Sequence, residues 1–267
     1  MSIDTRWART GCAYAWLAAE GFLVGAVILL LLNLGVGVTP ASGLTHYVNT
    51  AWLVVAGSAC LLLGMLAIIP VGLALREVLG RGPSTELMAT FFVAGSLLGV
   101  SSRLLLIPMR LSLASLVGTK GVQPQALNSF LMTYSVVENA TNWLLYGWFL
   151  LTGLALYHAS RSAIRQGALP RAWGWLGLIS AIGCWLVVLL SLATIVTDGP
   201  VVALAGRLSM AAVGVLLLPA WLTWLGRELG VILSPERTSM LGLARGIRLP
   251  RLSLAAPSWL LRLVGQP

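Results

Sequence analysis

Long apolar runs alternate with short polar segments along almost the whole chain. Six of these runs cover residues 12–34, 50–75, 87–108, 133–157, 172–196 and 201–225. An α-helix needs about 20 apolar residues to cross the hydrocarbon core of a bilayer, and each run meets that requirement. The pattern therefore predicts an all-α bundle of six transmembrane helices over residues 1–229, followed by a tail of different character over residues 230–267.

The charged residues between the runs predict the orientation of the bundle. Arginines occur before the first run, in the 76–86 and 159–171 segments, and in the tail from Arg227 onward. The 35–49 segment has no charged residue, the 109–132 segment has only Arg110 and Lys120, and the 197–200 turn has only Asp198. Basic residues gather on the cytoplasmic side of membrane proteins. We therefore predict that both termini are cytoplasmic.

The composition is that of a membrane protein. Hydrophobic residues make up 58% of the 267 residues and charged residues 9%, and the mean hydropathy is +0.91. The net charge of +9 comes from arginines that set the orientation, so we expect no nucleic-acid partner. The excess of arginine over lysine, with abundant alanine, glycine and leucine, fits a GC-rich bacterial genome. It predicts a bacterial cytoplasmic (inner) membrane location.

Small residues and prolines predict how the helices pack. Gly21-x-x-x-Gly25 and Gly95-x-x-x-Gly99 are expected to let the first and third helices approach their neighbours closely. A proline inside a helix removes one backbone hydrogen bond, so we predict kinks in the second and sixth helices, at Pro70 and Pro219. The three cysteines lie singly in separate runs and are expected to be packing residues: Cys12, Cys60 and Cys184.

The fourth run carries a polar stripe in its first half. With a period near 3.6, the following residues fall on one side of a helix: Asn128, Ser135, Glu138, Asn139, Asn142 and Tyr146. An uncompensated polar group in hydrocarbon costs several kcal/mol. The stripe is therefore expected to face partner helices or a wet cavity.

Three ionisable residues are expected at similar depth in the outer leaflet. At about 1.5 Å per residue, Arg103 lies roughly 24 Å, and Glu138 and Arg207 roughly 28 Å, from the cytoplasmic ends of their helices. Asn142 lies at nearly the same height. One interpretation is a structural cluster in which Glu138 bridges both arginines. A second is an outward-facing pocket that binds an anionic or polar headgroup, and a third is that the side chains only extend to the interface.

Glu20 is predicted to lie deeper, about 13 Å from the cytoplasmic edge of the first helix, with no basic residue at that depth in another run. It could be neutral and donate to a carbonyl that a proline kink leaves without a partner. Alternatively it could be a proton-coupling site. Both interpretations remain open at this point.

The tail mixes leucine with basic residues and two prolines. It is too short and too basic to span, and we predict that it lies on the cytoplasmic leaflet and binds anionic lipid headgroups. The residues expected to touch the membrane surface are Arg245, Arg248, Arg251 and Trp259. The competing interpretation is a disordered tail that a partner orders.

The sequence lacks the signatures of familiar membrane enzymes. His46 lies in an expected external segment and His158 at a cytoplasmic helix end, so they cannot jointly hold a haem or metal across the bundle. G-x-S-x-G, P-loop, H-E-x-x-H and C-x-x-C motifs do not occur. Lys120, the one lysine, lies outside the runs, which argues against retinal. We therefore expect no cofactor and no metal site, and the absence of motifs argues against an enzyme without excluding one.

A family resemblance occurs mainly over residues 146–177. A helix ending in GLALY at residues 153–157, a short basic loop and then LPRAWGWLG at residues 169–177 resemble bacterial polytopic membrane proteins grouped as a domain of unknown function. The likeness covers about a third of the chain. It implies a bacterial membrane bundle and carries no activity.

Two functions fit these patterns. The first is a non-enzymatic accessory or scaffold protein that binds lipid, an apolar ligand, another membrane protein or a second copy of itself. The alternative is a small proton-coupled transporter, in which Glu20 couples protons and the cluster of Arg103, Glu138 and Arg207 binds a polar or anionic substrate. A transporter would need a continuous polar cavity between Glu20 and that cluster.

Overall fold

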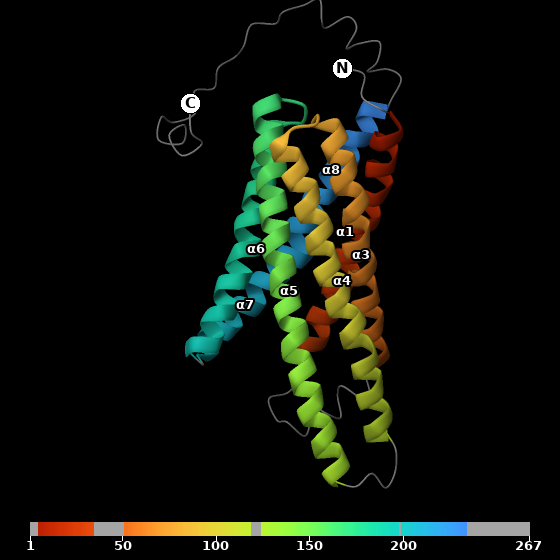
Figure 1. The fold of residues 1–267 in the computed structure, drawn as a ribbon, viewed down its shortest axis with the longest axis vertical. Coiled ribbons are helices and arrows are strands. Elements are labelled where there is room, and N and C mark those ends of the chain that lie inside the picture. The colour runs from red at the N-terminus through yellow and green to blue at the C-terminus, as the bar shows by residue number, and fades with distance from the viewer. Residues whose placement is uncertain (1–4, 35–50, 119–123, 198, 234–267) are drawn as a thin grey trace, which may run out of the picture. The chain divides into compact units, whose positions relative to one another are not determined.

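In the computed structural model, residues 5–34, 51–118, 124–197 and 199–233 are described (Figure 1). Every regular element in these ranges is helical, which confirms the all-α prediction for the described part of the chain. The helices are α1 (Thr5–Leu34), α3 (Ala51–Val78), α4 (Pro83–Gly118), α5 (Pro124–Gln166), α6 (Arg171–Thr197), α7 (Pro200–Ala211), the π-helix η1 (Ala212–Leu217) and α8 (Leu218–Leu233). The membrane-surface residues predicted in the tail, Arg245, Arg248, Arg251 and Trp259, lie outside the described residues.

Within the described ranges, five stretches of helix are long and apolar enough to cross a membrane. They cover Arg6–Leu32, Ala51–Val78, Pro83–Leu116, Arg171–Thr197 and Pro200–Leu233, the last being α7, η1 and α8 together. The chain is thus a multi-pass membrane protein by the length and composition of its helices. α5, with 43 residues, is the longest helix, but it is not among the five because its first half is polar. The sixth crossing remains a prediction.

Neighbouring helices in the chain are mostly neighbours in space. α1 packs on α3, α3 on α4, α4 on α5 and α5 on α6, and α8 returns to pack against α1 (Figure 1). The core includes two stacked indoles, Trp173 of α6 and Trp221 of α8, whose ring centroids lie 4.8 Å apart. Trp173 Nε1 donates to the carbonyl oxygen of Trp221 at 3.3 Å. These contacts join α6 to α8 at one end of the bundle.

The first predicted glycine pair lies where α1 packs closely on α3. A Cβ atom added at Gly25 would lie 2.7 Å from the carbonyl oxygen of Gly57 on α3, and one at Gly21 would lie 2.8 Å from that of Cys60. Real side chains essentially never approach a backbone oxygen so closely. The backbones of α1 and α3 can therefore meet only because these positions carry no side chain.

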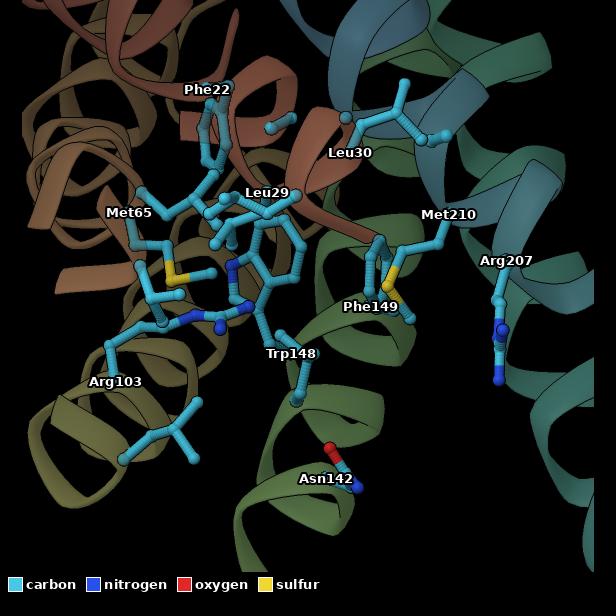
Figure 2. Close-up of a pocket in the computed structure, with 18 of the residues that line it drawn as sticks. Phe22, Leu29, Leu30, Met65, Arg103, Asn142, Trp148, Phe149, Arg207 and Met210 are labelled. Atoms are coloured by element: carbon cyan, nitrogen blue, oxygen red, sulfur yellow. The ribbon is translucent and has the colours of Figure 1, made fainter. Parts of the chain in front are cut away.

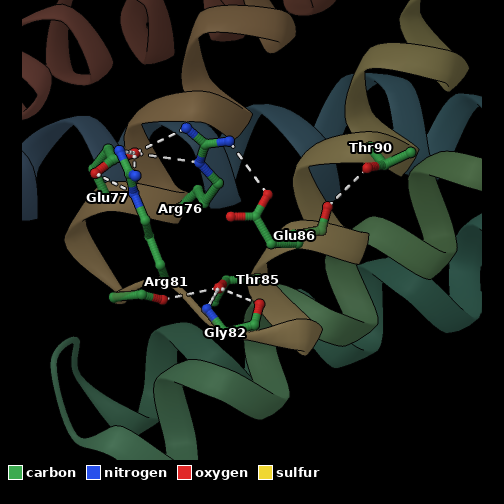
Figure 3. A network of polar contacts seen from close by, with 8 residues as sticks. Arg76, Glu77, Arg81, Gly82, Thr85, Glu86 and Thr90 are labelled. Carbon is green, nitrogen blue, oxygen red and sulfur yellow. Dashed lines mark hydrogen bonds and ion pairs between the residues drawn. The ribbon is translucent and has the colours of Figure 1, made fainter.

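The turn between α3 and α4 is held by a polar network (Figure 3). Glu77 accepts from Arg76 at 2.9 Å and from Arg81 at 3.1 Å, and Arg76 also reaches Glu86 at 3.3 Å. Thr85 Oγ1 accepts from the N–H of Gly82 at 2.9 Å, which satisfies a backbone donor at the start of α4. The arginines used to predict orientation thus also fix this turn.

Two helices extend well beyond their predicted boundaries. α4 continues to Gly118 and α5 begins at Pro124, so most of the 109–132 segment, expected to be a loop, is helical. Its alanine, leucine, methionine and glutamine residues favour helix, and a proline is well suited to the first helical position, as Pro124 is here. As a result Arg110 lies on α4, in the same helix as Arg103.

A π-helix immediately precedes Pro219 in the last crossing. The N–H of Leu218 bonds to the carbonyl oxygen of Val213, five residues earlier. Proline lacks an N–H, and its ring clashes with the carbonyl four residues before it. A wider turn relieves that clash, so the departure from regular α-helix before Pro219 takes the form of η1, with α7 before it and α8 after it (Figure 1).

Candidate functional site

A cavity of about 290 Å³ lies between α1, α3, α4, α5, α7 and η1 (Figure 2). Its walls are mostly apolar, with five polar residues among them. The apolar residues are Phe22, Ala26, Leu29, Leu30, Leu32, Val54, Leu61, Met65, Leu106, Leu145, Trp148, Phe149, Met210, Ala211 and Gly214, and the polar residues are Arg103, Arg110, Glu138, Asn142 and Arg207.

Aromatic rings form a rigid part of the apolar wall. The indole of Trp148 stacks on Phe22 of α1, with ring centroids 5.6 Å apart, and meets the edge of Phe149 at 4.6 Å. Both Trp148 and Phe149 are 3% exposed. These contacts join α1 to α5 across the cavity and fix the position of its inner surface.

The polar residues reach the cavity through helical spacing. Arg103 and Arg110 are separated by two turns on α4, and Glu138 and Asn142 by about one turn on α5, so each pair shares a helix face. The two helices are joined at this level, where Ser102 Oγ donates to the carbonyl oxygen of Thr141 at 2.9 Å. All four residues that the sequence grouped, Arg103, Glu138, Asn142 and Arg207, line this one cavity.

Glu138 lies against a residue that the sequence analysis missed. Its Oε1 is 4.0 Å from Nη2 of Arg110, and the two side chains are 41% and 19% exposed. Among the described residues, no ion pair joins Glu138 to Arg103 or Arg207. Figure 2 shows why: Arg207 lies beside Met210 on the opposite side of the cavity from Arg103. Arg110 was missed because its segment was expected to be a loop.

Arg103 is the buried charge of the site. Only 9% of it is exposed, and within the described ranges its side chain forms no hydrogen bond or ion pair. Its Nε has no partner, and neither has Nε1 of the neighbouring Trp148. Figure 2 shows the Arg103 side chain extending toward Trp148 and Met65. Guanidinium and indole groups can only donate hydrogen bonds, so this corner of the cavity offers donors without an acceptor.

Glu20 is not part of this site. Its side chain is on the exposed surface of α1, between Trp16 and Leu23, which are also exposed. It does not line the cavity, and no hydrogen bond to it is found in the described part of the chain. Neither the hydrogen-bonded interpretation nor the proton-coupling interpretation is tested by this position.

A second group of polar side chains lies at the end of α5 nearest the α3–α4 turn. Ser162 Oγ donates to Ser84 Oγ at 3.2 Å, which leaves the Ser84 hydroxyl free to donate to Nδ1 of His158 at 3.1 Å. Burial lowers the pKa of His158 below its usual 6.5, and the nearby Arg161 lowers it further. No group of His, Cys, Asp and Glu that could hold a metal ion is found among the described residues.

No protein-family model, no curated protein and no solved structure matches the chain. The resemblance of residues 146–177 to a bacterial family of unknown function therefore stays a prediction. No functional residue can be transferred from a relative, and the site must be interpreted from its own chemistry.

Proposed function

We propose that the protein is a non-enzymatic, multi-pass protein of the bacterial cytoplasmic membrane that binds a lipid or another apolar ligand within its helical bundle. In this proposal the chain crosses the membrane six times, with both termini in the cytoplasm. The arginine distribution supports the orientation. The sixth crossing is α5, whose polar residues Glu138 and Asn142 line the cavity, with Glu138 partly exposed at its edge.

The cavity is the observation that carries this proposal. Binding sites for small molecules are concave, mostly apolar and have a few polar groups that orient the ligand, with volumes of about 300–1,000 Å³. A cavity of about 290 Å³ with aromatic walls and a few polar residues has this character. It lies between helices long enough to span a bilayer, which makes molecules dissolved in the membrane the nearest supply of apolar ligands.

Two further observations favour binding over the alternative functions. A sealed structural cluster would pair its charges, whereas Arg103 is buried without an acidic partner in the described residues. A proton-coupled transporter would need a polar path from Glu20 to the cavity, and Glu20, exposed on α1, is not among the residues that line the cavity. The binding function therefore has the better support.

Native mass spectrometry of the full-length protein tests this function. Protein extracted into a mild nonionic detergent should retain a bound molecule that is absent after extensive delipidation. Met210 is half-buried in the cavity wall, and Met210→Trp should fill the cavity and reduce that retention. Met132→Trp makes the same change at a residue 72% exposed and outside the cavity, and should leave retention unchanged.

Two outcomes would contradict the proposal that a ligand binds in the cavity. One is that the wild-type protein retains no molecule and takes up no apolar probe after delipidation. The other is that Met210→Trp and Met132→Trp retain the same ligand equally well, which would place the ligand outside the cavity.

A further inference from the structure

The polar residues that line the cavity carry an excess of positive charge. Three arginines, Arg103, Arg110 and Arg207, and one carboxylate, Glu138, line it. The carboxylate lies near Arg110, which leaves two positive charges without an opposite charge among the lining residues. Charges inside a membrane protein are costly and are normally paired. The cavity is therefore complementary to an anion.

Arg103 is the group with the strongest requirement for such an anion. An unpaired buried charge costs several kcal/mol, and Arg103 is 9% exposed with no partner for its Nε. The indole N–H of Trp148, also without a partner, lies in the same wall. A carboxylate or phosphate has only acceptors and binds a guanidinium through paired, charge-assisted hydrogen bonds. Such an oxyanion would satisfy both donors.

The rest of the cavity does not suit a free inorganic ion. Apart from the polar residues, the walls are formed by aromatic and aliphatic side chains such as Phe22, Leu29, Met65 and Phe149. An anion alone would leave this surface empty. A molecule with an oxyanion at one end and a hydrocarbon chain at the other would match both parts, and the volume of about 290 Å³ admits a single chain rather than a whole two-chain lipid.

The route into the cavity runs from the side of the bundle. α7 packs on α6 and on η1 but is not closely packed against α5. The two residues at this edge of the cavity are accessible, since Arg207 of α7 is exposed and Glu138 of α5 is 41% exposed. An amphiphile can thus reach the cavity from the surrounding bilayer without passing through water.

Resting on the proposed function, we infer that the ligand is an amphiphile with one phosphate or carboxylate group and that Arg103 binds this oxyanion. The hydrocarbon chain lies against Trp148 and Phe22, and Arg207, on the opposite side of the cavity, adds a second positive charge that favours the anion. The source is either a free single-chain amphiphile or one chain of a bilayer phospholipid, since both present the same chemistry.

Binding to the delipidated full-length protein in nonionic detergent tests this inference. The probes are dodecyl phosphate, dodecanol and inorganic phosphate, and the signal is the ligand-induced rise in unfolding temperature. Dodecyl phosphate should stabilise the protein far more than dodecanol or inorganic phosphate. Arg103→Gln should weaken its binding at least about tenfold, since a hydrogen bond to a charged group contributes about 1.5–3 kcal/mol. Arg171→Gln, which removes an exposed arginine outside the cavity, should not weaken it.

The failures are distinguishable. If dodecanol binds as tightly as dodecyl phosphate, or if Arg103→Gln binds dodecyl phosphate as well as the wild type does, the oxyanion is wrong while an apolar ligand still stands. If inorganic phosphate alone binds as tightly, the amphiphile is wrong. If none of the probes binds, the proposed function fails as well. If Arg103→Gln does not fold, Arg207→Gln takes its place in the test. This variant is expected to weaken the binding of dodecyl phosphate several-fold, and unchanged binding would count against the site.

A second arm distinguishes the two sources. The protein is placed in nanodiscs of phosphatidylcholine with and without phosphatidylglycerol, and bound lipid is measured by native mass spectrometry. If the wild-type protein retains phosphatidylglycerol and Arg103→Gln does not, the ligand is a bilayer phospholipid. Binding of dodecyl phosphate without retained phosphatidylglycerol would identify a free single-chain amphiphile, and either result supports the oxyanion site.

Discussion

Replacing Arg103 by methionine should stabilise the unliganded protein. The guanidinium is 9% exposed, lacks a partner for Nε and is close to the apolar wall of the cavity. Methionine has a similar length and needs no hydrogen-bond acceptor. Replacement of buried charged groups by apolar residues of similar volume often stabilises a protein by about 1–4 kcal/mol, and an arginine without a partner is expected to lie in the upper part of that range.

The opposite sign is expected if Arg103 belongs to a structural ion-pair cluster. Removing one member of a buried pair leaves the other charge uncompensated and destabilises a protein by about 3–5 kcal/mol. The two interpretations therefore differ in sign as well as in size. A measured destabilisation of more than about 2 kcal/mol by Arg103→Met would refute the binding interpretation of this arginine.

The assay is unfolding of the delipidated protein by urea in a nonionic detergent, monitored by circular dichroism; SDS is avoided because dodecyl sulfate is itself a single-chain anionic amphiphile and would occupy the proposed site. Arg171→Met is the matched control, because it removes an exposed arginine outside the cavity, and should change stability by less than about 0.5 kcal/mol. Dodecyl phosphate at a hundred times its dissociation constant should add about 2.7 kcal/mol to the wild type. The same ligand should add much less to the stability of Arg103→Met. The difference in stability between the variant and the wild type should therefore shrink or change sign when dodecyl phosphate is present.

Three further changes test the packing and the polar groups. A Cβ atom at Gly99 would lie 2.8 Å from Cδ1 of Trp148, so Gly99→Ala should push the indole into the cavity. The binding of dodecyl phosphate in the thermal-shift assay should then weaken about tenfold, while circular dichroism should show an intact helical fold. Gly25→Val would clash with the backbone of α3 at Gly57 and Leu61 as well as with the Leu61 side chain, and should abolish the monodisperse peak in detergent chromatography. Because burial and Arg161 lower the pKa of His158, the unfolded chain binds more protons than the folded one just below pH 6.5, and stability should fall as the pH falls through that value. His158→Gln should flatten this dependence in unfolding curves between pH 5 and pH 7.5, and an unchanged slope would show that other groups cause it.

The crossings and the membership of the polar cluster were accessible from the sequence for simple physical reasons. Helix length and hydropathy locate the crossings, and rise per residue places Arg103, Glu138 and Arg207 at similar depth. These residues do line one cavity. Depth alone, however, does not determine which side chains meet. Glu138 pairs with Arg110. The sequence analysis assigned Arg110 to a loop because the apolar run ends at residue 108, whereas the helix continues beyond it.

The position of Glu20 illustrates the same limit for rotation about a helix axis. α1 carries apolar residues on all of its faces, so the hydrophobic pattern does not indicate which face meets the bundle. The structure turns Ala18, Ala19 and Phe22 inward and Glu20 outward. The close contact at Gly21 and Gly25 decides this rotation. The sequence shows that these glycines permit a close helix contact, but it does not show which helix makes that contact.

The direction of α7 decides whether the three charges form a cluster or border a cavity. Each residue in an α-helix turns the chain by about 100°, so the extra residue in a π-turn rotates everything before it relative to everything after it. Here η1 lies between Arg207 on α7 and the buried face of α8. α7 continues along α6 and away from α5, which places Arg207 across the cavity from Arg103 (Figure 2). The π-turn before Pro219 thus offers a physical reason why Arg207 lies apart from Arg103 and why Glu138 does not bridge the two arginines; under the proposed function, an anion from outside the chain takes that place beside Arg103.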